Sequence, residues 1–118
     1  MNANTMYLES VDDESFQGVV DYSEHHPNNV VVVDYWAEWC GPCKALSHVI
    51  NRLAEDYTTR NEPVKFYAAN AEESGVSMEK HKIRSVPTLL FMKGGEVTAS
   101  LVGLHPESAI KNKITELL

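Results

Sequence analysis

The two cysteines of this 118-residue chain lie three positions apart, at Cys40 and Cys43, within the segment VVVVDYWAEWCGPCK. A disulfide between them closes a very small loop. The chain-entropy model gives such a cross-link only about 2 kcal/mol of stability, against about 5 kcal/mol for a loop of roughly a hundred residues. The pair is therefore poorly suited to stapling a fold and well suited to switching reversibly between a dithiol and a disulfide.

The residues around the pair predict which cysteine reacts first. Residues 30–35 form an apolar β-branched run typical of a central, buried strand, and the apolar positions from Leu46 to Tyr57 follow the period of an amphipathic helix. Pro42 suits the first turn of that helix. Cys40 then lies at a helix start, where free N–H groups and the helix dipole stabilise a thiolate. We expect Cys40 to attack a disulfide and Cys43, almost one helical turn later, to resolve the product.

The rest of the chain alternates between predicted strands and helices. Residues 6–10 suggest a short strand, Ser10 and the acids that follow it predict the start of a helix ending near residues 25–29, and residues 64–70 predict another strand. A short helix is expected over 72–80, a hairpin turning at Gly94-Gly95, and a helix opened by Pro106.

This order predicts an α/β fold. Its central sheet is expected to be mixed, mostly parallel and covered by helices on both faces, with a C-terminal hairpin and helix. A chain of this length supports one core but not two, so residues 1–118 are interpreted as a single domain. The strand that leads to Cys40 lies centrally, and the carboxyl ends of such strands are where chemistry is commonly placed.

Composition and net charge restrict the classes of partner that the protein can bind. The net charge of −7, with only ten scattered Lys and Arg residues, argues against nucleic acid. No apolar run is long enough to span a membrane, and the first ten residues lack the pattern of a signal peptide, so the expected location is the cytoplasm. A protein or small-molecule partner is expected.

The segment WAEWCGPCK, followed at matching spacing by VPTLLFMKGGE and LVG, resembles the thioredoxin family over nearly the whole chain. The resemblance implies the thioredoxin fold, with a five-stranded sheet, and a protein-disulfide reductase. It also implies a monomer with disulfide-containing protein substrates and a thioredoxin reductase or equivalent as partners. No bound cofactor is expected, and NADPH would act only through that reductase. Gly41 and Pro42 stand where oxidising relatives carry a histidine, so a reductant is expected.

Trp36 and Trp39 bracket an irregular turn and do not follow a helix or strand period, so Trp39 is expected on the substrate surface and Trp36 is expected to form a buried wall. The resemblance implies further roles. The Val86–Pro87 bond is expected to be cis and to face the cysteines. Asp34 is expected behind Cys43, handling its proton. The shallow apolar rim for an extended peptide comprises Trp39, Gly41, Pro42, Val86, Pro87 and Gly103.

Two positions depart from the family pattern. Ala68 stands where many bacterial members carry a buried lysine near the acid, and Lys65 cannot substitute for it because a shift of three residues along a strand reverses the face. Without a neighbouring ammonium, Asp34 should remain protonated to a higher pH. Leu104 follows Gly103 where a smaller residue is usual, which would alter the rim.

Two alternatives stay open on the sequence alone. A zinc site would need two further ligands besides the cysteines. The available nitrogen donors are His25, His26, His48, His81 and His105. None has the paired spacing of a zinc knuckle except the adjacent His25-His26, whose side chains cannot easily face one ion from a turn. A thioredoxin-fold docking subunit with little redox role would use many of the same surface residues. Activity toward a model disulfide separates both from a reductase.

Overall fold

The computed structural model describes residues 7–118, so the expectation of no leader at the N-terminus falls partly on residues outside the described part. The strands are β1 (Leu8–Val11), β2 (Val30–Trp36), β3 (Val64–Asn70), β4 (Thr88–Lys93) and β5 (Glu96–Val102). The helices are α1 (Phe16–His25), α2 (Gly41–Thr59), α3 (Gly75–Lys80) and α4 (Glu107–Leu117), with a 3₁₀ turn, η1, at Ala71–Glu73. No helix of this described part is long and apolar enough to cross a membrane.

The five strands form one mixed sheet in the order β1-β3-β2-β4-β5. β3 pairs in parallel with β1 and β2, whereas β4 pairs antiparallel with both β2 and β5. The α/β class and the C-terminal hairpin are confirmed. Parallel pairing is limited to two of the four strand pairs, because the hairpin joins the sheet beside β2 rather than beyond a wholly parallel array.

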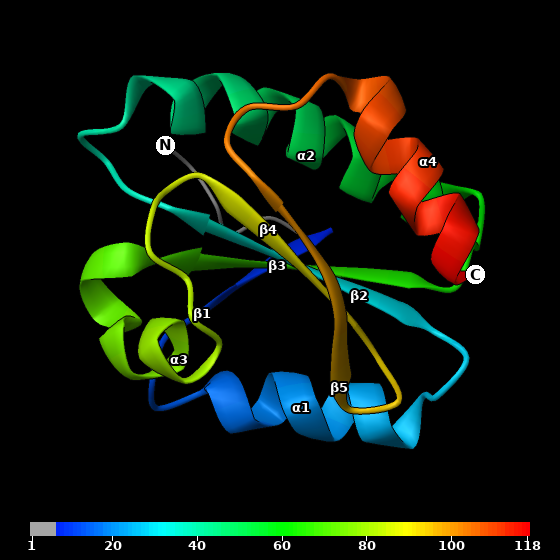
Figure 1. The fold of residues 1–118 in the computed structure, drawn as a ribbon. Coiled ribbons are helices and arrows are strands. Elements are labelled where there is room, and N and C mark those ends of the chain that lie inside the picture. Colours follow the sequence, from blue (N-terminus) through cyan, green and yellow to red (C-terminus); the bar gives the residue numbers. More distant parts are fainter. Residues whose placement is uncertain (1–6) are drawn as a thin grey trace.

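Helices cover both faces of the sheet (Figure 1), as expected: α2 and α4 lie on one face, and α1 and α3 lie on the other. The side chains of β2 alternate between the two hydrophobic cores, one on each face of the sheet. Val32 and Trp36 join the core under α2 and α4, while Val33 and Tyr35 join the core under α1. β2 is buried along its whole length, which explains its unbroken apolar sequence.

The predicted start of the first helix at Ser10 is wrong. Ser10 lies in β1, where it pairs with Ala68, and α1 begins only at Phe16. The acids have other tasks: the Asp12 carboxylate accepts a hydrogen bond from the Ser15 N–H at 3.0 Å, and the Asp13 carboxylate accepts bonds from two backbone N–H groups at the start of α3. An acid pattern typical of a local helix start thus caps a helix more than sixty residues away.

The other predicted elements are found close to their expected places. α2 begins at Gly41, the hairpin turns at Gly94-Gly95, and α4 follows Pro106. The helix expected over 72–80 is divided into η1 and α3, with Ser74 between them. The buried Ser74 Oγ has no hydrogen-bond partner there.

We predict that Ser23→Ala destabilises the protein by about 1–3 kcal/mol. Ser23 is fully buried in α1, and its hydroxyl accepts a 2.8 Å hydrogen bond from the Gly95 N–H, so the substitution leaves a donor of the hairpin turn unpaired. Urea denaturation measures the loss. The exposed Ser100→Ala in β5 is the matched control and should change the free energy of unfolding by less than about 0.5 kcal/mol. Equal effects from the two variants would contradict the assignment.

Candidate active site

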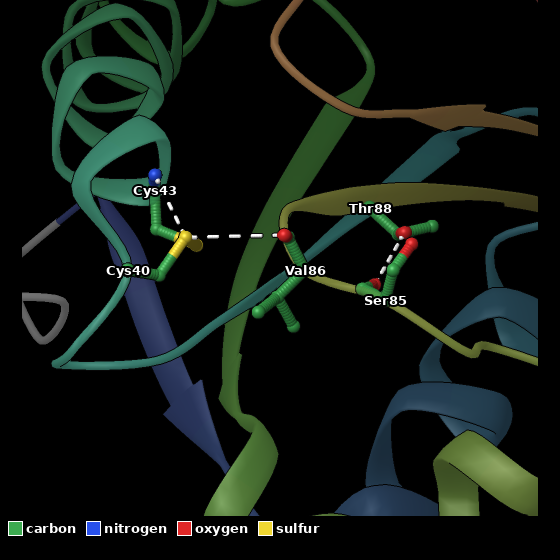
Figure 2. The surroundings of a disulfide bond; sticks show 5 residues. All are labelled: Cys40, Cys43, Ser85, Val86 and Thr88. Atoms are coloured by element: carbon green, nitrogen blue, oxygen red, sulfur yellow. Dashed lines mark hydrogen bonds between the residues drawn. A yellow bond between two sulfur atoms is a disulfide. The ribbon is translucent and has the colours of Figure 1, made fainter.

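Cys40 and Cys43 form a disulfide at the start of α2, shortly after the chain leaves β2. Cys40 is the N-cap residue of α2, and its Sγ accepts a 3.1 Å hydrogen bond from the Cys43 N–H (Figure 2). Pro42 lies in the first turn of α2. A backbone N–H at this position has no acceptor within the helix, so proline, which lacks the N–H, costs no helical hydrogen bond here. The expected position of the pair at a helix start is therefore confirmed, and a thiolate at Cys40 would receive the same N–H donor.

The two sulfur-bearing residues differ in access. Cys43 is fully buried against the core beneath α2, whereas Cys40 is 5% exposed and is flanked by exposed Trp39, Gly41 and Pro42. An external disulfide can therefore approach Cys40 more readily than Cys43.

The loop before β4 faces the disulfide. The Val86–Pro87 peptide bond is cis, as the resemblance implied, and the Val86 carbonyl oxygen lies 3.8 Å from Cys40 Sγ (Figure 2). The loop is braced from within, because the Thr88 hydroxyl donates a 2.7 Å hydrogen bond to the Ser85 carbonyl. A chain segment crossing Cys40 would thus meet the backbone at Val86.

Gly103 extends this surface from β5. Its N–H donates a 2.8 Å hydrogen bond to the Pro87 carbonyl, and its φ of +89° is a conformation that side chains other than glycine rarely adopt. Val86 and Gly103 are partly exposed, whereas Pro87 is buried and lies beneath the rim rather than on it. The structure thus places Val86 beside Cys40 and joins Gly103 to Pro87, and of the expected rim residues it buries Pro87.

Exposed apolar side chains lie on the segments that border this surface. Trp39 is 72% exposed, and on the β5 side of the loop Val102 is 62% exposed and Leu104 is 53% exposed. The sequence-based reading missed Val102. Its signal was available, since it directly precedes Gly103 at the end of an exposed edge strand. These side chains make one wall of the site apolar.

Asp34 is buried beneath this surface. Its side chain lies on the same face of β2 as Val32 and Trp36, which is the face that packs against α2 and contains Cys43. Asp34 is 2% exposed, its Oδ1 has no hydrogen-bond partner, and burial raises its pKa to about 7. A carboxyl group in such a place is poised to exchange a proton near neutral pH.

The strand register explains why no charge on the neighbouring strand lowers the raised pKa of Asp34. Ala68 of β3 lies directly beside Asp34, as a count from Pro87 predicted, and it offers no charge. Lys65 is on the opposite face of the sheet, where its ammonium pairs with Glu9 at 3.5 Å and lies over the Tyr67 ring. The reasoning that excluded Lys65 as a replacement is confirmed.

Trp36 forms the buried wall that was expected. It is 8% exposed, and its buried indole N–H has no hydrogen-bond partner. The zinc alternative gains no support, because residues 7–118 contain no group of three or more His, Cys, Asp or Glu side chains able to hold a metal ion.

Comparison with known proteins gives consistent matches. The family model described as Thioredoxin matches residues 7–116. "Thioredoxin M-type, chloroplastic" of Pisum sativum is 36% identical over 94% of this chain and 60% of its own length. "Thioredoxin" of Chlorobaculum thiosulfatiphilum is 39% identical over 93% of this chain and 94% of its own, and that of Haemophilus influenzae is 33% identical over 90% and 92%.

The chain thus spans about three fifths of the pea protein and nearly the full length of the two bacterial ones. The family match covers the sheet, the cysteine pair and the cis-proline loop together. This chain belongs to the thioredoxin family.

Proposed function

We propose that this chain is a protein-disulfide reductase that acts by dithiol-disulfide exchange. The observation that carries the proposal is the Cys40–Cys43 disulfide at the start of α2, with the Cys40 Sγ on the accessible side and the Val86 carbonyl opposite it. This arrangement supplies a nucleophile, a resolving thiol one helical turn away and a surface on which a substrate can lie. A docking subunit would need only the last of these features.

The reaction balances as two successive exchanges. In the reduced protein, the Cys40 thiolate attacks one sulfur of the substrate disulfide, which forms a mixed disulfide and releases one substrate thiolate. Cys43 then loses its proton and attacks the Cys40 sulfur, so that the second substrate thiolate leaves. The substrate gains two electrons, and the protein is left with the Cys40–Cys43 disulfide.

Asp34 is assigned the proton of Cys43. An ionised Asp34 carboxylate takes that proton at the resolving step, and its pKa of about 7 makes both protonation states available near neutral pH. Attack by Cys40 needs no such help, since the Cys43 N–H and the helix start stabilise its thiolate.

The substrate is assigned to the rim. An extended segment lies against Trp39, Gly41 and Pro42 on one side and against Val86 and Gly103 on the other, with Pro87 beneath them and backbone hydrogen bonds at Val86. Only the substrate's disulfide needs to reach Cys40, so a shallow surface can serve many proteins.

The remaining assignments follow from this chemistry. The protein acts as a monomer in the cytoplasm, where a dithiol stays reduced. Its electrons come from NADPH through a thioredoxin reductase or an equivalent enzyme, and it binds no cofactor of its own.

Reduction of insulin tests the proposal. With dithiothreitol, and separately with NADPH and a thioredoxin reductase, the protein should accelerate precipitation of the insulin B chain. The Cys40→Ser, Cys43→Ser double variant should give the uncatalysed rate. A wild-type protein that is no faster than this variant with dithiothreitol would remove the proposal and favour the docking alternative.

We predict that Cys43→Ser traps a mixed disulfide with a substrate protein, whereas Cys40→Ser does not. The first variant keeps the attacking thiol but cannot resolve, and the second keeps only a thiol that is fully buried in the structure. Non-reducing gel electrophoresis detects the adduct, and dithiothreitol should dissolve it. Adducts formed mainly by Cys40→Ser would reverse the assigned roles.

We predict that Asp34→Asn stabilises the protein increasingly as pH rises. The folded pKa of about 7 lies above the ordinary value of 3.8, so the protonated acid is tolerated at low pH, and stability is lost as pH rises through the folded pKa. At 1.36 kcal/mol per pKa unit, the advantage of the variant should grow by up to about 4 kcal/mol between pH 4 and pH 8.

Urea denaturation across this pH range measures the difference. The exposed Asp21→Asn in α1 is the matched control, and its difference from wild type should stay within about 0.5 kcal/mol throughout. A constant difference between Asp34→Asn and wild type would show that burial does not raise the pKa of Asp34. In the same variant, resolution of the mixed disulfide should slow more than its formation.

We predict that Ala68→Lys lowers the pKa of Asp34. The register places position 68 directly beside the carboxyl group, so an ammonium there favours the ionised form. Carbon NMR of the Asp34 carboxyl group follows its titration in both proteins. An unchanged titration in Ala68→Lys would mean that the strand neighbour does not control this carboxyl group.

A further inference from the structure

An open pocket of about 410 Å³ lies between α3 and the segment that leads to the cis-proline loop. Met78 and Ile83 supply apolar surface, and three charged residues also line the pocket: Glu79, Lys82 and Arg84. None of these residues is used by the exchange reaction itself.

The pocket has a built shape, because the chain folds back on α3 through a helix-ending turn. The Lys82 N–H donates to the Glu79 carbonyl at 3.2 Å, and the Ile83 N–H donates to the Met78 carbonyl at 2.8 Å. This is the pattern of a Schellman motif, in which the residue after the turn contacts the third residue from the helix end. That pair here is Ile83 and Met78, the apolar residues of the pocket.

Lys82 occupies the position of this motif that favours glycine. Its φ is +59°, in the left-handed region that is costly for a side chain such as lysine. α2 ends with the same two hydrogen bonds, and the residue there is Asn61, with φ of +60°. Asparagine is tolerated in this conformation, so lysine at the end of α3 is the exception that needs a reason.

The pocket ends two residues before the loop that faces Cys40. Arg84 is two residues before Val86, whose carbonyl faces Cys40 Sγ at 3.8 Å, and consecutive Cα atoms are about 3.8 Å apart. An extended segment advances about 3.3 Å per residue. At this spacing, a substrate side chain two to four residues from the attacked cysteine is within reach of Arg84 at the edge of the pocket.

The charges at the pocket favour an anion. Lys82 and Arg84 are both exposed, and within residues 7–118 neither has an ion-pair partner, so both charges are available to a ligand. Glu79 offsets one of the two positive charges and leaves an excess of one. In a chain of net charge −7, this is a local reversal of sign.

We propose that this pocket is a specificity site of the reductase. It receives an apolar side chain of the substrate segment that carries the target disulfide, and Lys82 and Arg84 hold a carboxylate beside that side chain. The preferred substrate is thus an extended, acidic-apolar segment. This inference rests on the proposed disulfide reduction and adds the class of substrate.

Synthetic disulfide peptides test the proposal. Three peptides are identical except for one residue pair, which is Leu-Glu, Leu-Lys or Ser-Glu. The pair is placed two to four residues from the target cysteine, before it in one set of peptides and after it in a second set. Reduction by the dithiol protein at low ionic strength should be about threefold faster for Leu-Glu than for Leu-Lys, and on the order of tenfold faster than for Ser-Glu. Added salt should remove the first preference and leave the second.

Two variants separate charge from shape. Arg84→Glu should reverse the order of Leu-Glu and Leu-Lys while keeping leucine preferred over serine. Lys111→Glu is the matched control, because it changes the net charge equally at an exposed site of α4, on the opposite face of the sheet (Figure 1). It should leave the order of the three peptides unchanged.

Lys82→Gly separates recognition from structure. Glycine removes the conformational cost at φ +59°, so the melting temperature should rise, while the preference for Leu-Glu over Leu-Lys should weaken. A purely structural role for Lys82 would raise the melting temperature without moving the preference.

The possible failures can be told apart. If the wild-type dithiol does not reduce even a small aromatic disulfide such as Ellman's reagent, the proposed function itself fails. If it does, but all three peptides react alike, the specificity site is wrong. The site is also wrong if Arg84→Glu changes only turnover by the reductase, or if it changes only the mass of the protein in solution, because the occupant is then the reductase or a second copy of this chain.

Discussion

The structure depends on the complete burial of β2. Every residue from Val30 to Trp36 is buried, and the strand is paired on both edges, with β3 in parallel and β4 antiparallel. A slip by one residue would exchange the two faces, which would move Asp34, Tyr35 and Trp36 into the wrong cores and break the pairing on both edges. Its end is therefore fixed in space, and the chain enters α2 after only four more residues. The fixed strand end and the helix start together decide where the Cys40 sulfur lies and which N–H group it meets.

The same strand carries a cost that packing alone does not justify. Asp34 interrupts a run of valines and is buried beside Ala68, with one carboxyl oxygen unpaired. An apolar residue at this position would suit the core better. In the proposed mechanism, an acid whose pKa is raised to about 7 serves to move a proton near a buried thiol, and its cost in stability is the kind commonly met at functional sites.

The surface around the sulfur is assembled from distant parts of the chain. The Val86–Pro87 loop meets Cys40, and Gly103, directly after β5, is bonded to that loop. The α3 pocket ends at Arg84, two residues before Val86. Trp39 makes the surface beside Cys40 apolar, whereas the pocket carries an excess positive charge. A shallow site with two such unlike parts can accept many chains and still favour some of them.

The sequence by itself determined the elements and the chemistry. Unbroken valines predicted a central strand, helical spacing predicted α2, and two cysteines on the first turn of that helix predicted exchange chemistry, because these signals are local. The family resemblance added the cis bond and the rim. A count from Pro87 also predicted Ala68 beside Asp34, which the strand register bears out. Tertiary structure alone decided two matters: that Asp13 caps α3 instead of starting α1, and that Lys82 and Arg84 flank a pocket. The first depends on a contact between segments more than sixty residues apart, and the second on the way the chain folds back on α3 through a left-handed turn, and no periodicity or spacing encodes either.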